Sequence, residues 1–313
     1  MGKIWKKIRP VRHFIGGYVY SFVSFIFAWT PLFLLYGLAD LLGNLAFFTK
    51  TKSIRRIFKN LKYAYGDDKD PKEQSAIARG VCINLPRGFM ESFRMIYRPP
   101  EDTAKTVEIT GLEHLDTALA KGKGVIGISA HLGNFFTLGS ALGSAGYSYN
   151  VVIKDSPNSM MAKIWRKGQI NSLNMPIPAE PAIDCVKTIL RKLKAGEIVT
   201  LVVDEDRSKG VPVEFFGKPA YTATGPAVLS LRSGAALVPI FAVREGKNRH
   251  RIIIEPAGEF ELGDDKDENI ATITEWCTRV IENMIRRYPD QWTWFNARWK
   301  TYQHKLKKSQ KLN

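Results

Sequence analysis

The chain has 313 residues, of which 45% are hydrophobic, enough for one large α/β core or two smaller domains. Its 46 Lys and Arg residues against 30 Asp and Glu give a formal net charge of +16. This charge favours anionic partners such as lipid surfaces, phosphorylated substrates or acidic carrier proteins. No zinc-finger, RNA-recognition or basic-zipper pattern is present, so nucleic acid is not an expected partner. The three widely spaced cysteines argue against a disulfide framework.

Residues 1–50 predict a basic flank followed by a membrane-anchoring segment. Residues 14–39 contain no charged side chain and are rich in aromatic residues. A helix through them would be long enough to cross a hydrocarbon core of about 30 Å. Pro31 within this stretch would instead kink the helix or divide it into two shorter interfacial helices. A buried hairpin or a secretory signal peptide is the alternative interpretation.

Residues 51–104 predict a helical region. The segment around residues 50–62 carries six Lys or Arg residues, typical of a surface on anionic headgroups or of a solvated helix face. Asp67 to Pro71 reads as a helix start, and apolar residues follow at nearly helical spacing up to Phe93. Glu91 and Arg94 on this helix are expected to form a surface pair.

Residues 105–303 predict an α/β domain, followed by a polar tail over 304–313. Apolar runs indicate strands over residues 107–109, 125–130, 149–154, 198–203, 236–243 and 251–254. Amphipathic or small-residue patterns indicate helices over residues 112–121, 138–146, 159–173, 183–193, 226–234 and 270–287. This alternation predicts a mostly parallel sheet with helices on both faces.

His131 is the leading candidate for chemistry. It directly follows the predicted strand 125–130 and precedes a Gly and an Asn, so it lies at the carboxyl end of a buried strand. Ligands of open α/β sheets bind at this edge, and an imidazole accepts a proton near neutral pH. The alternative is a structural histidine satisfied by a backbone hydrogen bond.

Charged residues follow two further strands. Lys154 and Asp155 end one of them, and Asp204, Asp206 and Arg207 follow another. The fold could bring these groups and His131 to one edge, although a solvated loop would have the same composition. The histidines lack metal-ligand spacing, and nucleotide-binding and nucleophile-elbow motifs are absent, so we expect neither a metal nor a cofactor.

The ordered set of motifs resembles a known family. It comprises an uncharged N-terminal segment, His131 and Asp204 at strand ends, Phe-Phe-Gly-Lys-Pro at 215–219, Thr-Gly-Pro at 224–226, and a Trp-rich end at 291–300. The chain resembles the bacterial lipid A late acyltransferases (lauroyl and myristoyl transferases) of the lysophospholipid acyltransferase-like superfamily. The resemblance covers nearly the whole chain and implies a glycerolipid acyltransferase-like α/β fold.

The resemblance implies a membrane-bound enzyme at the cytoplasmic face of the bacterial inner membrane. Its reaction would move a fatty acyl chain from an acyl carrier protein thioester, or from coenzyme A, to a hydroxyl of a lipid A precursor or related glycolipid. A lysophospholipid or another lipid is an alternative acceptor. The substrate-contacting residues would be Asn134, Lys154, Asp155, Asp206, Arg207 and Arg298.

The chain departs from the family at the residue that should orient the histidine. The family motif His-x4-Asp/Glu places its acid at position 136, which is Phe136 here. Three explanations follow. Asp204, Asp155 or Asp206 replaces the acid, or His131 acts with only a backbone or Asn134 hydrogen bond. In the third explanation, the protein binds lipid without catalysis.

Overall fold

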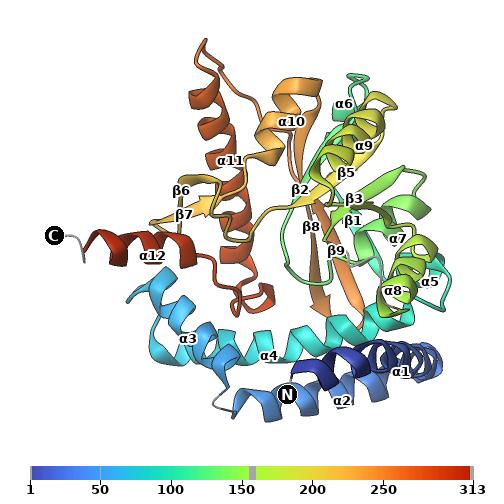
Figure 1. Cartoon of the computed structure of the whole chain (residues 1–313). Coiled ribbons are helices and arrows are strands. Elements are labelled where there is room, and N and C mark those ends of the chain that lie inside the picture. Colours follow the sequence, from blue (N-terminus) through green and yellow to red (C-terminus); the bar gives the residue numbers. More distant parts are fainter. Residues whose placement is uncertain (1, 50, 155–159, 311–313) are drawn as a thin grey trace.

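The computed structural model describes residues 2–49, 51–154 and 160–310 and contains a central seven-stranded sheet (Figure 1). The strand order is β1-β9-β8-β2-β5-β3-β4. These strands are β1 (Val107–Thr110), β2 (Val125–Ser129), β3 (Tyr149–Ile153), β4 (Met175–Pro178), β5 (Ile198–Val202), β8 (Ala236–Gly246) and β9 (Arg249–Ile254). Only β8 and β9 pair antiparallel among these strands. The predicted α/β class with a mostly parallel sheet is confirmed.

Helices cover both faces of this sheet. They are α6 (Leu112–Leu119), α7 (Thr137–Ser144), α8 (Met160–Asn171), α9 (Ala182–Lys194), α10 (Gly225–Ser233) and α11 (Lys266–Arg287). On β2, Ile126 and Ile128 pack into the core that contains α9, α10 and α11, whereas Val125 packs with α6 and α7. Helices on both faces bury β2 along its whole length, which explains why it carries no charged side chain.

The pairing of β2 with β5 sets the position of the candidate site. Their parallel register aligns Ser129 with Val202. Continued by two residues, the same register places His131 beside Asp204 at the carboxyl edge of the sheet. Residues 73 positions apart in the chain thereby become neighbours.

Four N-terminal helices lie on the side of the molecule that this carboxyl edge faces (Figure 1). They are α1 (Gly2–Trp29), α2 (Leu32–Phe47), α3 (Lys52–Tyr65) and α4 (Pro71–Arg94). Helix α4 runs across the edge, and α1 and α2 lie on the side of α4 that faces away from the sheet (Figure 1). A capping box between Asp70 and Glu73 starts α4. The helix start predicted between residues 67 and 71 is therefore correct.

Residues 14–39 do not form one continuous helix. Helix α1 ends at Trp29 and α2 begins at Leu32, because Pro31 lacks an amide donor and cannot continue the helix. The alternative of two shorter helices is the one observed. Among the described residues, no helix is by itself both long and apolar enough to cross a bilayer; α2 and α3 meet that test only together, with a 77° bend between them.

Some elements differ from the sequence-based expectation. The hairpin of β6 (Val211–Phe215) and β7 (Lys218–Thr222) turns through Phe216 and Gly217, both with positive φ, as a two-residue hairpin turn requires. Residues 304–309, within the expected polar tail, belong to α12 (Lys300–Ser309). The remaining short helices are α5 (Pro100–Ala104) and η1 (Pro289–Gln291).

Candidate active site

His131 and Asp204 form a hydrogen-bonded pair at the carboxyl edge of the sheet. Nδ1 of His131 lies 2.8 Å from Oδ1 of Asp204, and the backbone N–H of His131 donates to Oδ2 at 3.1 Å. The Asp204 side chain is fully buried, whereas 30% of the His131 side chain is exposed. The pair therefore presents an imidazole to its surroundings and hides the carboxylate behind it.

Trp292 completes the surroundings of Asp204. Its indole Nε1 donates to Oδ2 of Asp204 at 2.7 Å. Burial by itself would raise the pKa of Asp204, but the charge and hydrogen bonds of His131 and the Trp292 donor lower it below the ordinary value. Asp204 is consequently an ionised, acceptor-only group that fixes the ring orientation of His131.

Asp204 also sets the proton affinity of His131. Burial by itself would lower the pKa of His131, but the charge and hydrogen bond of Asp204 outweigh it and raise this pKa above its ordinary value. Since Nδ1 faces Asp204, Nε2 is the nitrogen left for a reactant. This arrangement suits a general base that must stabilise its own protonated form.

His131 opens onto an apolar cleft of about 350 Å³. Helix α4 forms one wall with Val81, Leu85 and Phe89, and the segment after the histidine forms another with Phe135 and Phe136. A third wall comes from the chain after η1. The cleft thus combines one titratable ring with surfaces suited to a hydrocarbon chain.

Phe136 belongs to this apolar wall. Its ring centroid lies 4.1 Å from that of Phe135 and 5.0 Å from that of Trp165 on α8. The acid that contacts His131 is instead Asp204, which comes from the neighbouring strand. Of the three explanations for the missing family acid, this geometry supports replacement by Asp204.

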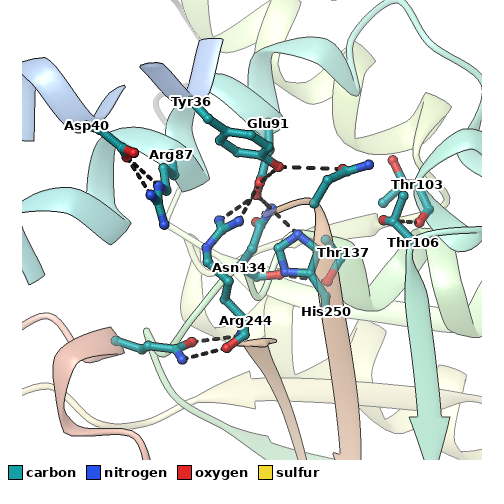
Figure 2. Close-up of polar contacts among 12 residues, drawn as sticks. Tyr36, Asp40, Arg87, Glu91, Thr103, Thr106, Asn134, Thr137, Arg244 and His250 are labelled. Atoms are coloured by element: carbon teal, nitrogen blue, oxygen red, sulfur yellow. Dashed lines mark hydrogen bonds and ion pairs between the residues drawn. The ribbon is translucent and has the colours of Figure 1, made fainter. Parts of the chain in front are cut away.

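Asn134 lines the cleft, but its side chain is buried and bound to Glu91. Its Nδ2 donates to Oε2 of Glu91 at 2.6 Å (Figure 2). Glu91 was expected to pair with Arg94 on the helix surface, and this expectation is wrong. The Glu91 carboxylate is bound by Arg244, whereas Arg94 donates to the carbonyls of Phe27 and Thr30.

The remaining charged candidates at the strand ends do not all reach the cleft. Lys154 is exposed beyond β3 and is not among the residues that line the cleft, and Asp155 lies outside the described residues. Arg207 is half-exposed and pairs at 3.3 Å with Glu205, which does line the cleft. Arg207 therefore approaches the cleft through its ion pair with Glu205.

Two predicted substrate-contacting residues, Asp206 and Arg298, form hydrogen bonds to other parts of the protein. Asp206 accepts hydrogen bonds from the backbone and hydroxyl of Thr301 at the start of α12. Arg298 is buried and donates to the carbonyl of Tyr221 and the hydroxyl of Thr222 on β7. Burial lowers the pKa of Arg298 to about 10 despite the nearby carboxylates. Both side chains thus already hydrogen-bond to other parts of the chain, and neither lines the cleft.

Sequence reasoning missed Glu91 and the link between Trp292 and Asp204. A signal for Glu91 was present, because it continues the apolar stripe of α4 that begins at Ile77 and Val81. A charge on such a stripe requires a buried partner. Among the described residues, no group of three or more His, Cys, Asp or Glu side chains is placed to hold a metal ion.

The fold and the site together define an α/β enzyme with a carboxylate-oriented histidine beside a cleft for an apolar chain, as lipid acyl transfer requires. The model of the bacterial lipid A biosynthesis acyltransferase family matches residues 3–301, and the chain belongs to this family. It is therefore a lipid acyltransferase, and the resemblance noted from the sequence is confirmed.

Curated relatives agree with this assignment. The lipid A biosynthesis lauroyltransferase of Escherichia coli is 25% identical over 280 residues, which are 87% of this chain and 87% of the relative. The lipid A biosynthesis palmitoleoyltransferase of the same organism is 26% identical, over 82% of this chain and 80% of the relative. A phosphatidylinositol mannoside acyltransferase of Mycobacterium tuberculosis is 27% identical over 70% of each chain.

Proposed function

We propose that the protein transfers a fatty acyl chain from an acyl carrier protein thioester, or from coenzyme A, to a hydroxyl of a lipid A precursor or related glycolipid. The observation that carries this proposal is the buried Asp204 carboxylate that orients His131 toward an apolar cleft. The names of the relatives support the acceptor class, because lipid A and phosphatidylinositol mannosides are both membrane glycolipids.

In the reaction, Nε2 of His131 removes the proton of the acceptor hydroxyl. The resulting oxygen nucleophile attacks the thioester carbonyl, the new C–O bond forms, and the C–S bond breaks. The imidazolium returns its proton to the departing thiolate, so the donor leaves as a free thiol. Asp204 stabilises the imidazolium between these steps, and general-base assistance of this kind is worth about 10²- to 10⁴-fold in rate.

The cleft would hold the acyl chain during this reaction. Phe89, Phe135, Phe136 and Leu85 offer apolar surface within the same cavity as His131. Each methylene group buried there contributes about 0.8 kcal/mol to binding. The aromatic side chain at position 136 therefore serves the fatty chain rather than the proton transfer.

We place the reaction at a membrane surface, the cytoplasmic face of the bacterial inner membrane. Helices α1 and α2 each expose a stripe of large apolar side chains, which a monomeric soluble protein rarely does on such a scale. The exposed members are Tyr18, Val19, Phe22, Phe25, Ile26, Trp29, Phe33, Leu34, Leu38, Leu41, Leu42 and Leu45. Helix α3 follows α2 in the chain and carries several Lys and Arg residues, which suit contact with anionic headgroups.

Lipid mass spectrometry tests the proposal. Lipids of a host that expresses the chain are compared with those of a host expressing His131→Ala. We expect one glycolipid class to gain the mass of an added acyl chain only with the wild-type protein. Gain on a lysophospholipid would replace the proposed acceptor. The same lipids in both hosts, with purified protein inactive toward carrier-protein and coenzyme A donors, would refute the proposal.

A further inference from the structure

Glu91 joins four separate parts of the chain. Its carboxylate accepts two hydrogen bonds from Arg244 on β8 at 2.6 and 2.7 Å, one from Asn134 at 2.6 Å and one from Tyr36 on α2 at 2.5 Å. His250 on β9 lies 3.4 Å away (Figure 2). A carboxylate with this many partners holds their mutual positions more firmly than any single pair would.

One path leads from Glu91 directly to the segment after His131. A carboxylate only accepts hydrogen bonds, so Asn134 must turn its Nδ2 toward Glu91. Among the described residues, Oδ1 of Asn134 has no hydrogen-bond partner, so Glu91 alone orients this carboxamide. The Asn134 carbonyl in turn accepts from the backbone N–H and the hydroxyl of Thr137 at the start of α7.

A second path leads from Glu91 to the same segment through Arg244. The side chain of Gln291 accepts from the Arg244 N–H at 2.7 Å and donates to its carbonyl at 2.8 Å. The Gln291 carbonyl then accepts from the N–H of Gly133 at 3.0 Å. Gly133 has φ +57°, and a Cβ there would lie 2.2 Å from the Ala242 carbonyl oxygen, so this segment rests directly on β8.

These two paths end next to the catalytic pair. Residues 131–134 are held at one end by Asp204 and at the other by Glu91. Between them, Leu132 pairs with Trp292, which is the donor to Asp204. Displacement of Asn134 would therefore move the cleft wall formed by Phe135 and Phe136, while the bond between His131 and Asp204 stays intact.

We propose that Glu91 is a positioning residue for acyl transfer, which acts through Asn134 and Gly133 on the segment that follows His131. This inference rests on the proposed function for its catalytic readout. Its effect on the order of residues 132–136 is independent of any reaction.

The chain offers a matched control in the same two helices. Asp40 on α2 and Arg87 on α4 form an ion pair at 2.6 Å, partly exposed, with neither residue lining the cleft (Figure 2). Asp40→Asn breaks a polar link between α2 and α4 without touching Asn134 or Arg244. Glu91→Gln keeps the side-chain shape and removes the charge.

The experiment compares Glu91→Gln, Asn134→Ala, their double variant and Asp40→Asn. We expect Glu91→Gln to lower kcat by on the order of 10- to 100-fold, since a shift of about 1 Å in a reacting group costs this much. The KM for the donor should change less than kcat, and the acid limb of the pH profile should stay in place. The double variant should be no slower than the slower single variant, because Asn134→Ala removes only a contact on which Glu91→Gln already acts.

Hydrogen exchange supplies the readout that needs no substrate. Amides of residues 132–136 should exchange faster in Glu91→Gln than in wild type, and Asp40→Asn should match wild type. Should Glu91→Gln fail to fold, Asn134→Ala carries the same two expectations. A folded Glu91→Gln protein with kcat within about twofold of wild type, or with unchanged exchange in this segment, overturns the inference. If wild type is inactive, the proposed function fails and the exchange result alone decides the role of Glu91.

Discussion

The indole of Trp292 donates to the same Asp204 carboxylate that holds the imidazole of His131. Trp292 lies 88 residues after Asp204 in the chain. The three tryptophans at the Trp-rich end of the sequence, Trp292, Trp294 and Trp299, are thus part of the buried core. Asp204 is therefore held by a buried indole donor as well as by His131.

Trp292→Phe should impair both folding stability and activity. It removes the indole donor from Oδ2 of Asp204, which then keeps only the backbone N–H of His131. The loss of a hydrogen bond to a buried charged group costs about 1.5–3 kcal/mol in free energy of unfolding. Chemical denaturation and kcat are measured together. Trp294→Phe is the control, because Trp294 is equally buried but donates to the Pro289 carbonyl. Comparable loss of activity in both variants would contradict a specific role of Trp292.

Asp204→Asn should shift the pH profile as well as lower the rate. Asp204 raises the pKa of His131, and the base works only when neutral, so wild-type activity is lost as the pH falls through this raised pKa. Removing the carboxylate charge lowers the His131 pKa and moves the acid limb to lower pH. We expect kcat to fall by about 10²- to 10⁴-fold. An acid limb that stays in place would show that another group titrates.

Phe136→Asp should not restore a stronger catalyst, although it recreates the family motif. Position 136 faces Phe135 and Trp165, and Nδ1 of His131 is already held by Asp204. A carboxylate there would disturb the apolar wall, so rates with long-chain donors should fall more than rates with short-chain donors. Phe136→Leu serves as the apolar control. Recovery of activity in Asp204→Asn by a second Phe136→Asp change would contradict this assignment.

Charged substitutions on α2 should weaken membrane binding without unfolding the protein. Phe33 and Leu41 are 72% and 57% exposed. Replacing either with Glu removes about 1.5–3 kcal/mol of apolar burial in lipid, or roughly tenfold or more in vesicle affinity. Sedimentation with vesicles that contain anionic lipid measures the effect. Ile183→Glu on α9 is the control, since Ile183 is 66% exposed on another part of the surface. Equal binding of all three variants and wild type would count against the membrane surface.

The sequence was most informative where burial dictates composition. The apolar runs of β2 and β5 predicted two strands of a mostly parallel sheet, and their carboxyl ends were the right place to look for the site. Which acid would meet His131 depended on the register between these strands, and a single strand carries no information about its neighbour. Asp204 was consequently one of three candidates until the structure aligned Ser129 with Val202.

Other features escaped prediction for physical reasons. The hairpin of β6 and β7 contains Pro212 and Pro219, and a proline within a short run weakens its strand signal. The buried position of Arg298 depends on the Tyr221 carbonyl and the Thr222 hydroxyl of β7, which no local pattern reveals. Glu91 was misjudged because its partners come from α2, β8 and the segment after β2, all of them distant in the chain.

The hydrogen bond from Tyr36 to Glu91 determines how a truncated form of this enzyme should be interpreted. Removing α1 and α2 by truncation before Lys52 is an obvious route to a protein that stays in solution without detergent, because these helices carry the exposed apolar side chains. It would also strip Glu91 of its phenolic donor and Arg94 of the two carbonyls that it caps. A shortened protein that lost turnover would then say nothing about the need for a bilayer, because the cut itself reaches the reaction centre.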